Sequence, residues 1–165
     1  MWTDHRKYLL LCLCIFVPLL LSSADRVDRV VVDKSEKKLY LMHSGEVVHS
    51  FHVVFGADPK GHKQHEGDER TPEGNYTLDY KNSHSKFHRS IHISYPNAKD
   101  RRRAKEKGLR PGGAIFIHGQ MNGLEWLSFA SQYFNWTDGC IALKNSDMDE
   151  VWKSVKPGTP IEIKP

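Results

Sequence analysis

The residue types most able to carry covalent chemistry are a cysteine and a histidine in the second half of the chain. Cys140 closes the segment Thr137-Asp138-Gly139-Cys140, and His118 lies 22 residues earlier, followed by Gly119. A cysteine attacks as its thiolate, so a catalytic cysteine needs a group that takes its proton, and an imidazole does this. Gly139 permits a sharp turn before the thiol. Backbone N–H groups near Gly139 and Cys140 can then form an oxyanion hole, which acyl transfer requires.

The chain begins with the pattern of an export signal. A short basic stretch precedes an apolar run of 13 residues from Leu9 to Leu21, and Ser22-Ser23-Ala24 supplies small residues for cleavage. A membrane span needs about 20 apolar residues, so a retained anchor is the weaker interpretation. We therefore predict a signal peptide over residues 1–24.

Removal of that segment leaves a single cysteine in an exported chain, because Cys12 and Cys14 lie inside the apolar run. Exported proteins normally pair their cysteines or have none, so Cys140 needs a functional reason. From residue types alone, Cys140 can instead be a structural residue, since a free cysteine is frequently a small buried apolar side chain.

The remaining 141 residues, 25–165, suffice for one domain with a proper core and are too few for two ordinary domains. They hold 22 lysines and arginines against 19 acidic residues, a net charge of +3. This charge suits an anionic polymer such as a cell wall and is too weak to indicate nucleic-acid binding.

The elements that must position the cysteine and the histidine are mainly β-strands. Alternating or β-branched runs predict strands, Asn97 to Lys107 predicts a helix that stops at Gly108, and a second helix ends near Val155 after a cap at Asn145 or Ser146. A long polar loop from Gly56 to Gly74 interrupts the strands, and loops of this length are usually functional. The predicted strands are 27–32, 38–42, 46–55, 75–80, 87–95, 114–118, 140–143 and 160–163.

The motifs together resemble the L,D-transpeptidase catalytic domain family, YkuD. The matching features are His118-Gly119, the Thr-x-Gly-Cys-Ile segment ending at Ile141, and the Gly-Asp-x-Arg-Thr-Pro-x-Gly loop from Gly67 to Gly74. The likeness covers roughly residues 27–164. It implies a mainly β fold, a β-sandwich with mixed sheets and a few short helices, acting as a single catalytic domain in the periplasm or the cell wall.

The resemblance also implies a reaction. Cys140 matches the family nucleophile, His118 its general base, and Gly119 the residue whose carbonyl orients the imidazole. The chain would then transfer acyl groups on peptidoglycan stem peptides through a thioester, forming cross-links or attaching a protein such as a wall-attached lipoprotein. No cofactor, metal or nucleic acid enters this reaction, and we expect a monomer.

Two positions depart from the family pattern and leave alternatives open. Many members have His or Arg where Asp138 stands, and Arg where Ala142 stands. The segment Thr137-Asp138-Gly139 still resembles the loop that shapes the oxyanion site, but the missing cations put the acceptor in question. Hydrolysis by an L,D-carboxypeptidase or amidase is one alternative, and a non-catalytic wall-binding module is another.

Three further features each have a functional interpretation and a purely structural one. His84, His88 and His92 recur every four residues, but on a strand they lie too far apart to share a metal ion, so we assign no metal and place His92 in the substrate cleft. Arg70, in the polar loop, is a candidate for substrate binding. The basic run from Arg101 to Arg110 is either a solvated helix face or a dock for stem-peptide carboxylates or an anionic polymer.

Overall fold

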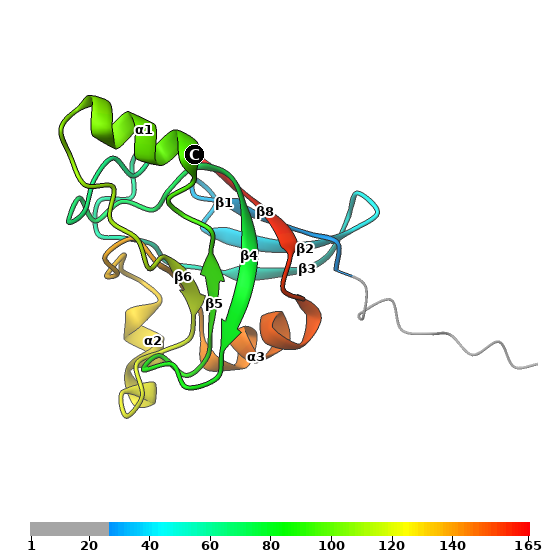
Figure 1. The fold of residues 1–165 in the computed structure, drawn as a ribbon. Coiled ribbons are helices and arrows are strands. Elements are labelled where there is room, and N and C mark those ends of the chain that lie inside the picture. Colours follow the sequence, from blue (N-terminus) through cyan, green and yellow to red (C-terminus); the bar gives the residue numbers. More distant parts are fainter. Residues whose placement is uncertain (1–26) are drawn as a thin grey trace, which may run out of the picture.

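A computed structural model describes residues 27–165, and the predicted signal peptide therefore lies outside the described residues. Eight strands form one mixed sheet in the order β3-β2-β1-β8-β4-β5-β6-β7, with short helices around it (Figure 1). The strands are β1 (Arg29–Asp33), β2 (Lys38–His43), β3 (Glu46–His52), β4 (Gly74–Asn82), β5 (Ser90–Ile93), β6 (Phe116–His118), β7 (Ile141–Ala142) and β8 (Thr159–Lys164). The expected mainly β class with mixed pairing is confirmed.

The helical elements are few and short. They are α1 (Ala98–Glu106), η2 (Glu125–Leu127), α2 (Ser128–Ser131) and α3 (Asn145–Ser154). Asn97 caps α1 by accepting hydrogen bonds from the backbone of Lys99 and Asp100, as its residue type favours. Each helix within residues 27–165 is too short or too polar to cross a lipid bilayer.

The N-terminal meander of β1, β2 and β3 is antiparallel, and its turn at Ser44-Gly45 has positive φ angles at both residues. β8, the last strand of the chain, inserts between β1 and β4 and pairs parallel with β1. The first and last strands of residues 27–165 therefore lie side by side near the centre of the sheet. The side chains of β8 alternate between the two faces of the sheet, so Ile161 and Ile163 are almost fully buried, whereas Pro160 and Lys164 are exposed.

The two outer strands of the sheet are joined by the chain that follows β3. Val54 exchanges two backbone hydrogen bonds with Ala142 of β7, at 2.9 and 3.0 Å. Gly56 forms a second isolated bridge with Thr137. These contacts curl the sheet toward a closed barrel, and we call them the seam. The apolar interior includes Leu39, Phe55, Leu78, Ile117, Met148 and Ile161, each fully or almost fully buried.

Several strands are shorter than their sequence patterns predicted, and the strand expected over 87–95 differs most. The sequence predicts a strand over 87–95, whereas β5 covers only Ser90–Ile93. His88 has a φ of +60°, a conformation that a strand does not allow, and its backbone N–H bonds to Asn122. Phe87 therefore leaves the core side, where alternation had placed it beside Ile91, and lies against His118 instead.

The central strand should dominate stability. Replacing Ile161 by alanine in β8 is expected to lower the free energy of unfolding by about 3 kcal/mol, because the side chain is 1% exposed and leaves a cavity. Val47→Ala on the edge strand β3, where the side chain is 54% exposed, is the matched control and should cost less than about 0.5 kcal/mol. Chemical denaturation measures both. Equal losses would contradict this picture of the core.

Candidate active site

His118 and Cys140 lie on one face of two adjacent parallel strands. β6 and β7 pair with Ile117 opposite Ile141 and His118 opposite Ala142. Ile117 and Ile141 point into the core, so His118 and the residue before β7, Cys140, point to the other face. An offset of two residues on strands about 4.8 Å apart brings the two side chains to the same region of the sheet. Both line one cavity of about 780 Å³.

The His118 imidazole is held in a defined orientation. Its Nδ1 donates a hydrogen bond of 2.7 Å to the carbonyl oxygen of Gly119. Because a carbonyl only accepts, Nδ1 carries the proton and Nε2 is left with its lone pair in the neutral ring. The rings of Phe87 and Trp136 lie 4.6 and 5.8 Å from the imidazole, centroid to centroid.

Burial keeps the imidazole neutral. Only 4% of His118 is exposed, and this burial lowers the pKa of the imidazole to about 4, against a smaller opposing effect of its bond to Gly119. Desolvation disfavours the charged form of the ring. His118 is therefore an unprotonated base at neutral pH, although a histidine in water is partly protonated near pH 6.5.

The Cys140 thiol contacts the backbone of the strand beside it. The N–H of Phe116 lies 3.4 Å from Sγ, and Sγ lies 3.7 Å from the carbonyl oxygen of Ala114. Burial raises the pKa of the Cys140 thiol and the Asp138 carboxylate raises it further, whereas the Phe116 N–H and the Lys63 ammonium lower it. The resting state is thus a neutral thiol beside a neutral imidazole. The contact of the Phe116 N–H with the sulfur could not be predicted from the sequence, because every residue type except proline carries a backbone N–H.

The turn before Cys140 is fixed by Thr137 and by glycine. Thr137 Oγ1 donates to the carbonyl of Cys140 at 2.7 Å and accepts from the N–H of Gly139 at 3.2 Å. The Gly139 N–H is therefore already used and is a poorer oxyanion donor than expected. The Cys140 N–H forms no hydrogen bond within residues 27–165.

Gly139 itself allows a close backbone contact. Its φ is +122°, and a Cβ atom there would lie 2.5 Å from the carbonyl oxygen of Arg70. The main chain of Arg70 thus supports the turn from behind. Its side chain points elsewhere and pairs with Asp58 at 2.9 Å, outside the residues that line the cavity.

The remaining candidates are distributed unevenly around the cavity. Asp138 lines it, and so do Thr137, His84 and Trp136. His92 does not, because its Nδ1 pairs with Asp79 at 2.7 Å and its ring stacks on Tyr80 at 4.7 Å. Ala142 is fully buried and also absent from the lining.

The cavity has one lysine that the sequence alone did not single out. Lys86, in the loop before β5, is the only lysine or arginine among the lining residues, and Asp138 is the only carboxylate. Asn145 or Ser146 was expected to cap α3, but the N-cap is Lys144 and no side chain caps the helix. Asn145 Oδ1 instead accepts from the N–H of Gln120 at 2.7 Å, and it packs where a Cβ atom on Gly119 would lie.

Among the described residues, no group of three or more His, Cys, Asp or Glu side chains is placed to hold a metal ion. His88 binds Asp149 at 2.7 Å, and His92 binds Asp79, so these two histidines face different partners.

The fold defines a mainly β protein whose curled mixed sheet carries a thiol, an imidazole and a cavity beside its seam. The chain belongs to the L,D-transpeptidase catalytic domain family (YkuD), whose sequence profile matches residues 27–163. Members of this family act on peptidoglycan stem peptides and are typically located in the periplasm or the cell wall.

Individual relatives are more distant. YafK of Escherichia coli K12 is 27% identical over 112 residues, which cover 67% of this chain and 38% of YafK. The structure is similar to that of Pgp2 from Campylobacter jejuni, a helical cell shape determining protein, with a TM-score of 0.63, 26% identity, and coverage of 84% of this chain and 48% of Pgp2. An L,D-transpeptidase from Mycobacterium smegmatis shares the fold, with a TM-score of 0.56, 16% identity, and coverage of 82% and 58%. The chain thus spans less than half the length of YafK and Pgp2.

The glycine at position 139 should be irreplaceable. Gly139→Ala is expected to cost at least about 3 kcal/mol of unfolding free energy, because the new Cβ atom meets the Arg70 carbonyl at a strained φ. Gly158→Ala is the matched control: its φ is +93°, but nothing lies within 4 Å of its Cβ position, so it should cost about 1 kcal/mol. Thermal and urea unfolding distinguish the two. A tolerated Gly139→Ala would show that the turn can move.

Proposed function

We propose that this chain is a cysteine acyltransferase of peptidoglycan. Cys140 Sγ attacks the carbonyl at the L-centre of a diamino acid in a tetrapeptide stem, and His118 Nε2 takes the thiol proton. The terminal D-alanine leaves with that proton on its nitrogen, and a thioester remains on Cys140. An amine then attacks the thioester, which forms a cross-link or attaches a protein, and the thiol is restored.

One observation carries this proposal. The Cys140 sulfur accepts a hydrogen bond from the Phe116 N–H. The strand that supplies this donor, β6, also ends in His118. Because His118 Nδ1 is bonded to the Gly119 carbonyl, its Nε2 is left free. A backbone donor thus stabilises charge on sulfur, and a neutral base lies at the same cavity. Oriented by the carbonyl, His118 needs no carboxylate to complete a triad.

Both side chains are neutral at rest, so proton transfer belongs to the attack itself. A thiolate–imidazolium pair would place two charges in a half-buried site, which burial disfavours. The thiol proton instead moves to His118 as the sulfur–carbon bond forms, which is general base catalysis. The Cys140 N–H is the free backbone donor for the oxyanion.

The charges of the cavity suit the proposed substrate. Lys86 offers a cation and Asp138 a carboxylate, and the side chain of a diamino dicarboxylic acid ends in a carboxylate and an amine. Hydrolysis is the second candidate, because Ala142 is buried and puts no cation beside the thiol to hold an acceptor's carboxylate. Water would then release a tripeptide stem.

The reaction is tested with purified protein and a soluble tetrapeptide muropeptide. Loss of D-alanine should be detected by mass spectrometry and should fall by at least about 10³-fold in Cys140→Ala, which has no nucleophile. Repeating the assay with a competing amine distinguishes transfer from hydrolysis by product mass. A carbapenem-like acylator should add its mass to the wild type and not to Cys140→Ala. Identical products for both proteins, with no adduct, would leave a non-catalytic wall-binding module.

The pH dependence tests the neutral pair. Because the pKa of His118 is lowered to about 4, the base form persists down to that pH, and kcat/KM should fall only below about pH 4. The raised pKa of Cys140 keeps the thiol protonated through neutral pH. The rate should therefore be flat from about pH 4 through neutral pH. Rates from pH 3.5 to 9 on the soluble substrate measure this. An acid limb near 6.5 would mean that His118 is solvated and that the neutral-pair mechanism is wrong.

A further inference from the structure

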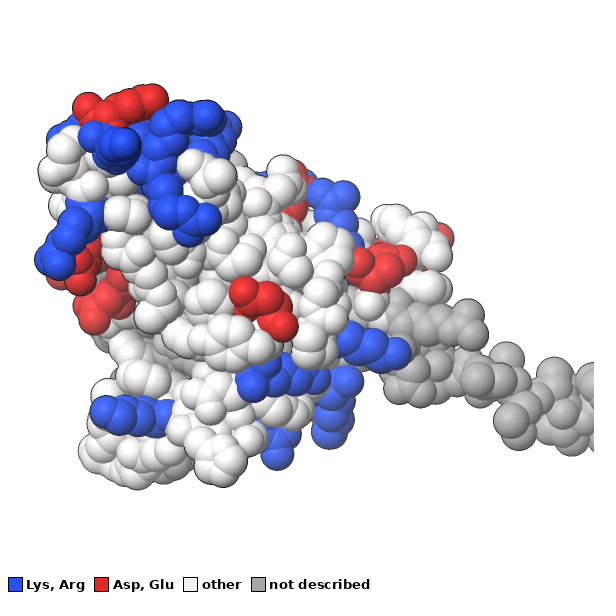
Figure 2. All heavy atoms as spheres, in the orientation of Figure 1, with Lys and Arg blue, Asp and Glu red and all other residues white. Residues whose placement is uncertain are grey.

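The positive charge of this protein is concentrated on and just after α1. Residues 99–110 contain seven lysines and arginines and two acidic residues, a net charge of +5, whereas the whole chain carries +4. The rest of the chain is therefore nearly neutral. Figure 2 shows these basic side chains gathered over α1 at one end of the molecule.

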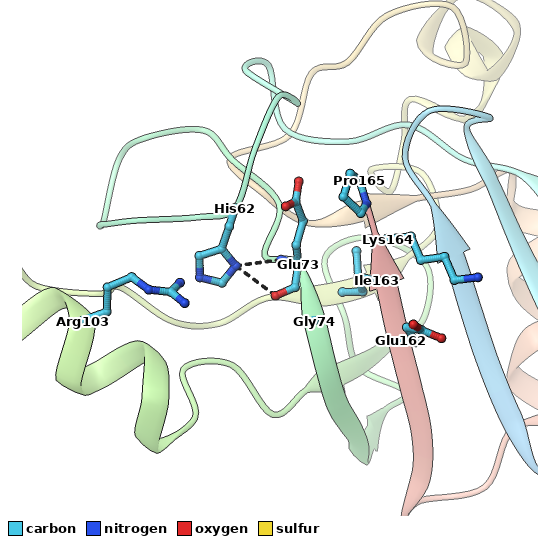
Figure 3. Close-up of a pocket in the computed structure, with 8 residues that line it drawn as sticks. All are labelled: His62, Glu73, Gly74, Arg103, Glu162, Ile163, Lys164 and Pro165. Carbon is cyan, nitrogen blue, oxygen red and sulfur yellow. Dashed lines mark hydrogen bonds between the residues drawn. The ribbon is translucent and has the colours of Figure 1, made fainter.

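Asp100, one of the two acidic residues, is buried and does not lie on the surface beside these cations. Asp100 is 4% exposed, accepts from the Tyr76 hydroxyl at 3.1 Å, and lies 3.2 Å from His62. Arg103 extends from α1 back toward His62, which itself bonds to the backbone of Glu73 (Figure 3). Asp100 and Arg103 therefore belong to the packing of α1 against the long loop, and the outer face keeps the other cations.

Four of those cations form what we call the α1 cation patch: Lys99, Arg101, Arg102 and Lys105. All four are exposed, and among the described residues none of them has a carboxylate within 4 Å. With 3.6 residues per turn, Arg101, Arg102 and Lys105 fall within an arc of about 100° on the side away from buried Asp100 and Ala104. Their charge is thus available to a partner.

The patch is connected to the candidate active site by a short segment. The chain leaves α1 at Gly108 and reaches Gly113 and Ala114, which line the cavity. Figure 1 shows this segment running from α1 down to β6. Eight residues of chain lead from Lys105 to Gly113, so the two lie at most about 28 Å apart. A long polymer held at the cavity can cross that distance, whereas a short soluble peptide is confined to the cavity.

We propose that the α1 cation patch docks the peptidoglycan polymer through the carboxylates of neighbouring stem peptides, while one stem occupies the cavity. This rests on the proposed function. Guanidinium groups pair with carboxylates in a planar, two-bonded geometry, and Arg101 and Arg102 supply two of them. Arg101 Nη1 donates to the carbonyl oxygen of Pro96, which leaves its other N–H groups for a partner. Each exposed pair is weak alone, but several act together on a polymer that repeats its carboxylates.

The test compares two triple variants of equal net charge. Arg101→Gln/Arg102→Gln/Lys105→Gln removes three of the four cations of the patch and leaves Lys99, and Lys38→Gln/Lys60→Gln/Lys156→Gln removes three exposed lysines elsewhere. Binding to insoluble sacculi is measured by co-sedimentation as NaCl rises from about 25 to about 300 mM, a range over which screening weakens exposed charge pairs. The patch variant should bind about tenfold more weakly at low salt and lose most of its salt dependence, while the control stays within about twofold.

Turnover of the soluble tetrapeptide separates this proposal from the proposed function. It should be equal in the wild type and the patch variant, because the patch contacts only the polymer. Equal loss of sacculus binding in both triple variants would overturn the proposal in favour of net charge alone. Loss of binding to vesicles of phosphatidylglycerol, with sacculus binding kept, would overturn it in favour of a lipid surface. If no variant turns over the peptide, the proposed function fails, and sacculus binding still decides whether the patch holds the polymer.

Discussion

Three backbone segments meet behind Cys140 with no room for a side chain between them. A Cβ atom on Gly56 would lie 1.9 Å from the carbonyl oxygen of Glu69, and one on Gly139 would lie 2.5 Å from that of Arg70. This contact joins the end of β3, the long polar loop and the turn before β7. The contact supports the turn that carries the thiol, and Thr137 holds the same turn through the Cys140 carbonyl and the Gly139 N–H. The glycines are therefore a steric requirement rather than a source of flexibility.

The electrostatics of the site follow from this packing. Burial lowers the pKa of His118 and raises that of Cys140. The residues that surround and position the two groups therefore also keep them uncharged. The buried pair of Lys63 and Asp68, 2.7 Å apart, stiffens the polar loop nearby, since Asp68 also accepts from three backbone N–H groups. The Lys63 ammonium lowers the pKa of the Cys140 thiol, but burial outweighs this effect and the pKa stays raised.

Much of the fold was predictable from alternation and turn residues, and the failures are local. The strands, the helix at 98–106 and the Ser44-Gly45 turn follow from patterns that depend on near neighbours. The late start of β5 does not, because His88, just before it, has a positive φ and its N–H bonds to Asn122, 34 residues away. For the same reason the sequence did not reveal Phe87 beside the imidazole, the Phe116 N–H on the sulfur, or Lys86 in the cavity. Backbone donors and distant loops leave no mark on residue type. Arg70 and His92 were selected by motif and by periodicity, but ion pairs with Asp58 and Asp79 direct their side chains elsewhere.

The seam has a consequence for the order in which this molecule acquires its chemistry. It joins Val54 to Ala142 and Gly56 to Thr137, so its bridges connect residues more than 80 positions apart. Contacts of such long range cost the most chain entropy and form late in folding. The N-terminal meander can assemble from local contacts, but it contains neither the thiol nor the imidazole. Cys140 therefore obtains its environment only when residues 54–56 have paired with residues 137–142. A partly folded chain carries a thiol that lacks this environment.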